Sequence, residues 1–220
     1  MAPLLEDAAT GIASPKILDC GCGTGHNLLM LRRYGRAVGI DLTWTGLSYA
    51  HERGERGIAQ ATAGFLPFAS GTFDIVTSFD VIYALSDADE QAALSEMFRV
   101  LKPGGHLVVN AAAMDLLKGN HSVLALEVRR YDRGALRERL ERTGFAVRRM
   151  SYTNATILPV VAAVRLLQRV SGHEESEEEI SVPPAPVNAA LTAALAIEAA
   201  LLRFINMPFG SSLMALAQKP

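Results

Sequence analysis

The sequence predicts an α/β fold: a doubly wound, seven-stranded and mostly parallel sheet with an antiparallel last strand and a helical insertion before that strand. Three observations lead to this prediction. Between Lys16 and Asn154, short β-branched apolar runs alternate with longer helical stretches, which is typical of a sheet covered by helices on both faces. After Asn154 the chain becomes rich in Ala and Leu, and its last ten residues alternate in polarity like a strand. A chain of 220 residues suits one domain with one elaboration, so we expect a single domain over 1–220.

Each predicted strand is a short apolar run, and most are rich in β-branched or aromatic side chains. In chain order the first six are Lys16–Cys20, Ala37–Asp41, Gly57–Thr62, Phe73–Phe79, His106–Ala111 and Phe145–Tyr152. The seventh, Ser211–Pro220, is expected to pair antiparallel with the sixth.

Helices are predicted between these strands, at His26–Arg33, Trp44–Arg53, Asp87–Leu101 and Arg133–Thr143. The tetrapeptide Lys102-Pro103-Gly104-Gly105 is expected to end the third helix and to turn the chain into the next strand. Proline breaks a helix, and glycine accepts the positive φ that such a turn needs.

The segment 155–205 is predicted to be a helical insertion. Two Ala- and Leu-rich stretches, 155–167 and 187–204, flank an acidic, proline-containing connection over 171–186 that cannot bury a core. Exposed apolar stripes suit two roles, a cap over the substrate or the interface of a homodimer, and both remain open.

Composition and charge exclude several classes of protein. Half of the residues are hydrophobic and a fifth are charged, which excludes a disordered or coiled-coil chain. Neither apolar stretch offers about 20 uninterrupted apolar residues, so we expect no membrane span, although peripheral contact stays possible. The first 15 residues do not resemble a signal peptide.

The chain has two cysteines, Cys20 and Cys22, and they lie too close in sequence to form an ordinary disulfide. Two thiolates without further Cys or His at ligand spacing are too few for a metal site, so we expect no metal. The absence of a disulfide framework favours a reducing, cytoplasmic setting.

Nucleic acid is not an expected partner either. The formal net charge of −2 provides no attractive field for a polyanion. Eight arginines gather between residues 129 and 149, but acids alternate with them, which favours a solvated helix face over an RNA site.

The strongest chemical signal is a glycine loop at the end of the first predicted strand. Gly21, Gly23 and Gly25 follow the buried run directly and precede a helix, an arrangement that lets a ligand approach the backbone. The second strand ends at Asp41, where a carboxylate is placed to accept hydrogen bonds from a ribose diol. The spacing predicts an adenosyl ligand. It disfavours a dinucleotide, because that fingerprint needs its third glycine at position 26, which is His26.

The chain resembles the class I, Rossmann-like S-adenosylmethionine-dependent methyltransferases, and within them the type 11 group. Four motifs carry this resemblance in the right order: ILDCGCGTG (17–25), VGID (38–41), LPFASGTFDIVTSFDVI (66–82) and FRVLKPGGHLVV (98–109). It covers Lys16 to about Asn154 and implies seven strands with the last antiparallel.

The resemblance implies S-adenosylmethionine as the cofactor. Asp19 would lie near its methionine amino end, the glycine loop would wrap its backbone, Asp41 would hold the ribose hydroxyls and Leu42 would pack on adenine. The implied cofactor-binding residues are Asp19, Gly21, Cys22, Gly23, Gly25, Asp41, Leu42, Thr62, Ala63 and Phe79.

The chain departs from the family pattern at two places that matter for function. Thr62-Ala63 replaces the Asp-Ala pair that usually reaches the adenine edge, and Tyr83-Ala84 replaces a frequent Glu-His pair. A later segment, 121–131, resembles one that some members place over the active site, and it implies His121 and Tyr131 as candidate proton acceptors.

The function predicted is S-adenosylmethionine-dependent methyl transfer to a small, partly hydrophobic molecule. The departures keep a second hypothesis open, a module that binds S-adenosylmethionine without turnover. A third, an NAD-dependent reductase, is disfavoured by the glycine spacing.

Overall fold

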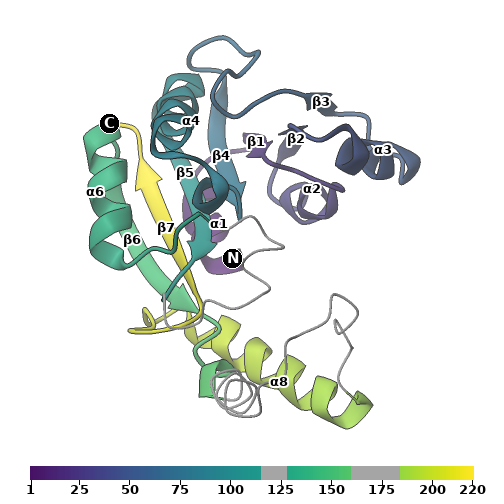
Figure 1. Cartoon of the computed structure of the whole chain (residues 1–220), viewed down its shortest axis with the longest axis vertical. Coiled ribbons are helices and arrows are strands. Elements are labelled where there is room, and N and C mark those ends of the chain that lie inside the picture. The colour runs from purple at the N-terminus through teal and green to yellow at the C-terminus, as the bar shows by residue number, and fades with distance from the viewer. Residues whose placement is uncertain (115–127, 160–183) are drawn as a thin grey trace.

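The computed structural model describes residues 1–114, 128–159 and 184–220 and contains one seven-stranded sheet (Figure 1). The strand order is β3-β2-β1-β4-β5-β7-β6, and β7 is antiparallel to both of its neighbours. The predicted fold class is confirmed, including the antiparallel last strand. That strand pairs with β6 as expected and also with β5, because it lies between them.

The strands lie close to their predicted positions. Their bounds are β1 Lys16–Cys20, β2 Arg36–Asp41, β3 Ile58–Gln60, β4 Phe73–Phe79, β5 Leu101–Ala112, β6 Ala146–Thr153 and β7 Ser212–Gln218. The parallel strands β1, β2 and β4 end at the same edge of the sheet, in register at Asp19↔Gly39 and Asp19↔Thr77. This edge therefore gathers Asp19, Asp41 and the residues that follow β4.

The start of β5 differs from the prediction. The helix does end at Val100, but Leu101 already pairs with Phe73, and the ladder resumes only at Ile75↔His106. The tetrapeptide 102–105 is thus an irregularity within the strand rather than a turn before it, with Gly104 at φ +79°. Asp74 holds this irregular stretch by accepting from Lys102 Nζ at 2.6 Å.

Apart from α1, the α-helices match their predicted positions to within a few residues. They are α1 Ala2–Ala9, α2 His26–Leu31, α3 Trp44–Glu52, α4 Asp87–Val100, α6 Arg133–Thr143 and α8 Ala185–Leu201, with a 3₁₀ turn, η1, over Ile82–Ala84. Ser86 and Asp132 cap α4 and α6 by accepting from Asp89 N and Ala135 N. Gly144, at φ +107°, ends α6.

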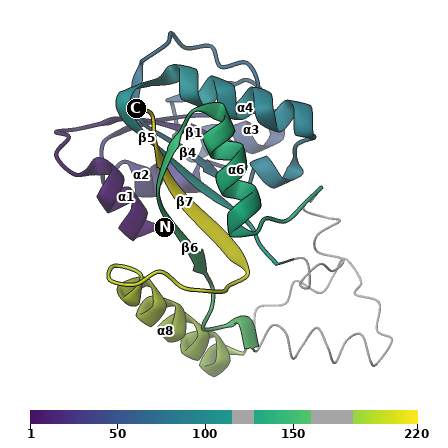
Figure 2. The same cartoon turned by 90° about the vertical axis from the view of Figure 1, so that its left-hand side faces the viewer.

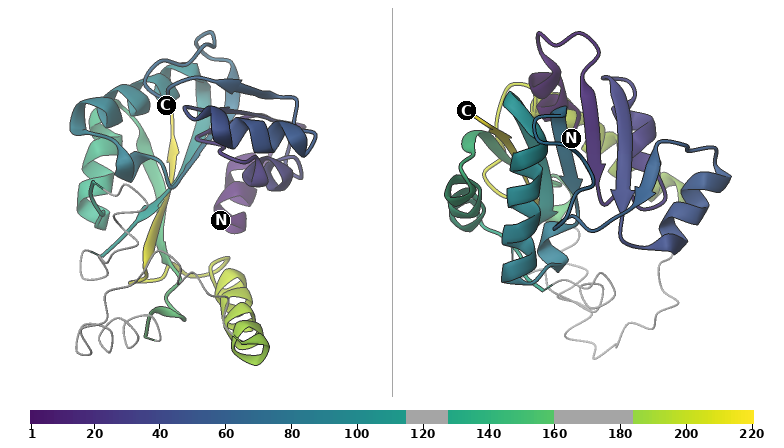
Figure 3. Two further views of the ribbon diagram at one scale, coloured as in Figure 1. Left: turned by 45° about the vertical axis from the view of Figure 1, so that its right-hand side comes forward. Right: turned by 90° about the horizontal axis from the view of Figure 1, so that it is seen from above.

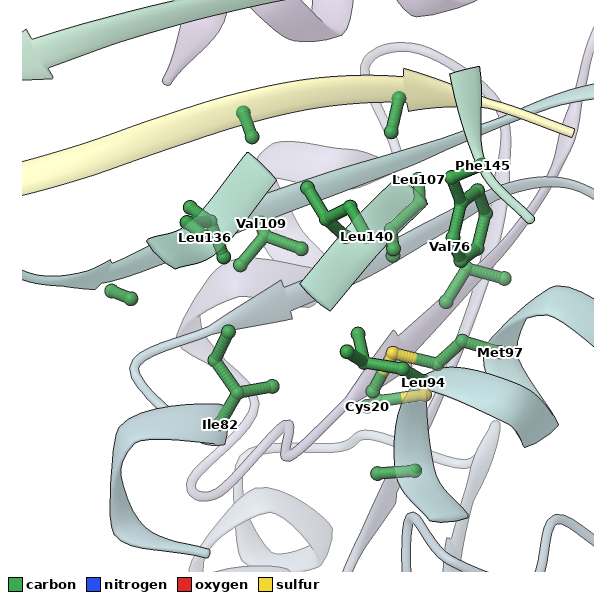
Figure 4. Close-up of a cluster of buried hydrophobic side chains, with 14 of the residues drawn as sticks. Cys20, Val76, Ile82, Leu94, Met97, Leu107, Val109, Leu136, Leu140 and Phe145 are labelled. Carbon is green, nitrogen blue, oxygen red and sulfur yellow. The ribbon is translucent and has the colours of Figure 1, made fainter. Parts of the chain in front are cut away.

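Helices cover both faces of the sheet, as Figure 2 shows. On one face, α4 and α6 pack over β4, β5 and β7 through the cluster in Figure 4, where Leu94 and Met97 meet Val76, Leu107 and Leu140. On the other face, α1, α2 and α3 contribute Leu4, Leu28 and Leu47 to a second cluster. Burial of both faces explains why the central strands are almost continuously apolar.

The helix α1 was not predicted. Leu4, Leu5 and Ala8 are at most 1% exposed, and α1 packs against β5 and β7. Positions 4, 5 and 8 are one, three and four residues apart, so their side chains lie on one face of a helix. The sequence therefore does contain a signal for α1.

The helical insertion is partly described. The helix α8 lies beyond the edge at which β4, β5 and β6 end (Figures 1 and 3). The buried side chain of α8 is Glu198, which accepts from Asn154 N at 2.5 Å and from Thr156 N and Oγ1 at 2.8 Å. The predicted helix 155–167 and connection 171–186 fall mostly outside the described residues.

Within the described ranges, no helix combines the length and apolar character that crossing a membrane requires. The helix α8 is nevertheless apolar around most of its circumference, and Ile197 is 61% exposed.

Candidate functional site

The glycine loop, residues 21–25, begins directly after β1 and is hydrogen-bonded to the end of β2. Gly21 N and Cys22 N both donate to Ile40 O, at 2.8 and 2.9 Å, so backbone hydrogen bonds hold the start of the loop. Gly21 has φ +86°, and a Cβ there would lie 2.2 Å from Val81 Cγ2. Glycine is required at this position, because the loop touches the chain that follows β4.

The outer part of the loop is open. A Cβ at Gly23 would meet nothing within 4 Å, and Gly25, at φ +80°, starts α2. Gly23 N donates to Asp41 Oδ2 at 2.8 Å, which ties the loop to the end of β2. The loop therefore presents bare backbone at a helix N-terminus, which suits a ligand that lies along it.

Asp41 is held in place from two sides. Besides Gly23 N, its carboxylate accepts from Thr43 N at 2.8 Å and Thr43 Oγ1 at 2.6 Å. Two carboxylate oxygens offer about four lone pairs, so Asp41 retains about one acceptor site, on Oδ2, for a ribose hydroxyl. Asp41 is half-buried at the mouth of the loop, as the sequence predicts.

Asp19 is buried at the end of β1, next to the loop. Thr77 Oγ1 donates to Asp19 Oδ1 at 2.7 Å, whereas Asp19 Oδ2 is buried with no hydrogen-bond partner. Burial raises the pKa of Asp19 to about 6, an effect that the Thr77 hydrogen bond opposes and the Asp41 charge reinforces. An unpartnered, desolvated carboxyl oxygen suits the ammonium group of a ligand.

The remaining residues of the predicted cofactor site surround this centre. Leu42 is 67% exposed after β2, Thr62 and Ala63 follow β3, and Phe79 is buried at the end of β4. Leu42 has free surface on which a flat ring could stack. Their contacts with a cofactor stay predictions.

Cys22 has a structural role. Its side chain fills the space above Gly39, where a Cβ would lie 2.7 Å from Cys22 Sγ. Burial raises the pKa of its thiol to about 12, so it is not a thiolate near neutral pH.

Of the two candidate proton acceptors, the structure describes Tyr131. His121 lies outside the described residues. Tyr131 is 2% exposed in the core, its hydroxyl lies 3.4 Å from Ile82 O, and burial raises the pKa of the phenol. Arg129, which precedes it, pairs with buried Glu90. A catalytic role for His121 or Tyr131 stays a prediction.

A cavity of about 360 Å³ lies at the edge of the sheet where β4 ends, and it was not predicted from the sequence. Its walls are strand ends and α8: Met1, Asp80, Asn110, Thr153, Asn154, Leu195, Glu198, Ala199, Leu202, Ser212 and Met214. Val81, which follows the cavity residue Asp80 in the chain, lies against Gly21 of the glycine loop. Asp80 directly after an apolar strand, and Asn110 inside one, were the signals available in the sequence.

Among the residues that the structure describes, no group of three or more His, Cys, Asp or Glu side chains is placed to hold a metal ion.

Residues 18–109 match the model of a methyltransferase domain family, and this stretch contains the glycine loop, Asp19 and Asp41. Over this stretch the chain is similar to the class I methyltransferases of type 11. It is 39% identical over 112 residues to a demethylmenaquinone methyltransferase of Thermus thermophilus, covering 47% of this chain and 50% of that one. It is 28% identical over 190 residues to a malonyl-[acyl-carrier protein] O-methyltransferase of Methylovorus, covering 76% and 62%. The chain thus spans about half of the first relative's length.

Solved structures share the fold. An S-adenosylmethionine-dependent methyltransferase of Archaeoglobus fulgidus superposes with a TM-score of 0.62 at 14% identity, covering 97% of this chain and 89% of that one. A phosphoethanolamine N-methyltransferase of Haemonchus contortus, in complex with S-adenosylmethionine, gives 0.62 at 18% identity, covering 100% and 52%.

S-adenosylmethionine is the cofactor of this family, and the residues of the site fit it. The unpartnered oxygen of Asp19 matches an ammonium group, and the open backbone at Gly23 admits a chain. The half-buried Asp41 matches a ribose hydroxyl.

Proposed function

We propose that the chain transfers a methyl group from S-adenosylmethionine to a small, partly hydrophobic acceptor. The observation that carries the proposal is the buried, unpartnered Asp19 Oδ2 beside the open glycine loop, which suits the ammonium end of the cofactor. A cavity for a second molecule lies at the same edge of the sheet, because Asp80, which lines it, directly follows β4. A volume of about 360 Å³ lies within the range of small-molecule sites.

The residues of the chain would divide the work as follows. Asp19, the glycine loop and Asp41 bind the cofactor, which supplies a methyl carbon made electrophilic by its sulfonium. The chain then has to orient an acceptor and exclude water. Leu195 and Ala199 of α8, with Leu202 directly after the helix, form an apolar wall that helps to exclude water.

We further propose that the insertion 155–205 acts as a cap within a single domain. Glu198 supports this role, because its three hydrogen bonds fasten α8 to the turn after β6, at the edge where the cavity opens. A homodimer interface is the alternative, and the exposed Val187, Ile197 and Leu201 on α8 favour it.

Two measurements test the proposed function. Calorimetry with S-adenosylmethionine, S-adenosylhomocysteine and NADH should give binding of the first two and none of NADH; tight NADH binding would indicate a reductase instead. Methyl transfer to a panel of small metabolites then separates an enzyme from a module that binds the cofactor without turnover, the alternative suggested by Thr62 and Tyr83-Ala84.

A further inference from the structure

The connection between β3 and β4, residues 61–72, begins beside the end of β2. Ala61 N donates to Asp41 O at 3.0 Å, and Gln60 Nε2 donates to Leu42 O at 3.0 Å. A ligand whose ribose binds the Asp41 carboxylate would therefore have its base close to Leu42 and to the first residues of this connection. The conformation of the connection thus bears on how the base is recognised.

The connection has few internal hydrogen bonds of its own at this point. It contains no charged residue and no helix or strand. Phe65 N donates to Thr62 O at 3.1 Å, and Gly64 N donates to Thr62 Oγ1 at 3.3 Å, which closes one turn over residues 62–65. Thr62 and Phe65 are exposed. An irregular, exposed turn of this kind keeps one conformation when neighbouring elements satisfy the backbone groups around it.

Two side chains near the end of α4, Glu96 and Arg99, bind the backbone directly after this turn. Glu96 Oε2 accepts from Leu66 N at 2.7 Å. Arg99 Nη2 donates to Leu66 O at 3.0 Å, and Arg99 Nη1 donates to Phe68 O at 2.8 Å. Leu66 is therefore held through both its N–H and its C=O group, four residues after Thr62.

Glu96 and Arg99 also orient each other. Arg99 Nε donates to Glu96 Oε1 at 2.6 Å, and Arg99 Nη2 donates to Glu96 Oε2 at 2.8 Å. Arg99 Nη1 also reaches Ser70 Oγ at 3.4 Å, so every nitrogen of the guanidinium has an acceptor. A lysine would keep the charge of Arg99 but lacks the planar fork that makes these bonds together.

α4 also packs against the turn itself. A Cβ at Gly64 would lie 3.5 Å from Ala92 Cβ, and Leu66 is 2% exposed. The turn 62–65 thus lies between two fixed points, which are the hydrogen bond to the Asp41 backbone on one side and Leu66 on the other. Releasing Leu66 would free the turn at one end.

We propose that Arg99 and Glu96 are positioning residues for the base of the cofactor, because they hold the turn 62–65 in the conformation that borders the adenine. The inference rests on the proposed function, since it concerns the cofactor of that reaction. Neither side chain needs to touch the cofactor: both act through the backbone of Leu66. The motif FRVLKPGG (98–109 with its following strand), which contains Arg99, would then serve the cofactor site from behind the turn.

The test compares two ligands, S-adenosylhomocysteine and S-ribosylhomocysteine, which keeps the ribose and the amino acid but lacks adenine. Their dissociation constants are measured with the full chain by calorimetry, the second in competition with the first, well below the melting temperature. Arg99→Lys is the informative variant. Arg137→Lys is the matched control, because Arg137 pairs with Glu141 on the surface of α6 and has no printed bond to a loop backbone.

Arg99→Lys should weaken binding of S-adenosylhomocysteine about tenfold and change binding of S-ribosylhomocysteine by less than about twofold. Arg137→Lys should change both by less than about twofold. Unchanged binding of S-adenosylhomocysteine to Arg99→Lys would overturn the inference. An equal loss for both ligands would also overturn it, because a purely structural role weakens the whole site. Failure of S-adenosylhomocysteine to bind the unmodified chain would instead overturn the proposed function.

Discussion

Two aspartates at neighbouring strand ends have opposite environments. Asp41 is half-buried and accepts three hydrogen bonds from the chain, whereas Asp19 is buried and accepts one from a side chain, through a single oxygen. Desolvation dominates at Asp19, so its pKa is raised to about 6. Sequence position alone predicts a cofactor role for both, but the difference between them depends on burial, which the sequence does not show.

Replacing Asp41 should weaken cofactor binding. Asp41→Ala removes a charge-assisted bond to a ribose hydroxyl, so the affinity for S-adenosylmethionine should fall by about 1.5 to 3 kcal/mol, roughly 10-fold to 150-fold. Calorimetry measures this loss. Thr43→Ala is the control, because it removes one hydrogen bond that positions Asp41 but keeps the carboxylate. If Asp41→Ala changed the affinity less than threefold while the protein stayed folded, the assignment of Asp41 to ribose would be wrong.

Asp19 should make stability depend on pH. Its pKa is about 6 in the folded chain against an ordinary value of 3.8, so between these values the folded state holds a proton that the unfolded state has lost. The free energy of unfolding should therefore fall as pH rises from 4 to 6, by about 3 kcal/mol for two pKa units, and then stay constant. Urea unfolding at pH 4, 5, 6 and 7 measures it.

The variant Asp19→Asn isolates this contribution, since it cannot ionise and should flatten the slope between pH 4 and 6. A slope that is identical in both proteins would show that another group is responsible. Because an ammonium group favours the carboxylate form, affinity for S-adenosylmethionine should rise over the same pH interval in the unmodified chain only.

At the scale of elements, most helices and the position of α8 near the carboxyl ends of the strands were predictable, but the way in which α8 is attached was not. Caps and breakers mark α4 and α6: Ser86, Asp132 and Gly144 appear in the sequence at the positions where they act. In α8, one acid among alanines and leucines looks like an interruption of an apolar surface. It is instead the residue that attaches the helix, because Glu198 satisfies donors of a turn 42 and 44 residues earlier in the chain.

Glu198→Ala should loosen α8 without unfolding the sheet. It leaves Asn154 N and Thr156 N without their acceptor, at a cost of about 1 to 3 kcal/mol for each group. Amide hydrogens of 185–201 should then exchange at least about tenfold faster, while those of β1 and β4 keep their rates. Glu6→Ala is the control: it removes an exposed pair with Arg203, which should change exchange by less than about twofold. Unchanged exchange in α8 would show that other contacts hold it.

At the scale of the whole molecule, the sequence predicts the doubly wound domain well because its signals are local. Apolar runs, glycine turns and caps each specify a nearby piece of chain, and parallel strands bring Asp19 and Asp41 to one edge. The cavity could not be predicted in this way. It forms where β4, β5, β6, β7 and α8 meet, and contacts such as Asp80–Asn110 join residues 30 positions apart. The same limitation applies to β5, whose irregular start depends on pairing with Phe73 across the sheet.

Amide hydrogen exchange in α8 distinguishes the two proposed roles of the insertion, a cap and a dimer interface. Ile197 is 61% and Phe204 85% exposed, so an apolar surface remains on the side away from the cavity, where a second copy of the chain could cover it. As a cap, α8 should gain protection over 188–204 when S-adenosylhomocysteine and an acceptor analogue bind, in a protein shown to be monomeric, because the ligand fills the cavity beneath Leu195 and Leu202. Hydrogen exchange with and without both ligands measures this, and α6 serves as the internal control because it does not line the cavity. Protection that rises with protein concentration and ignores ligand would assign the same helix to a dimer interface instead.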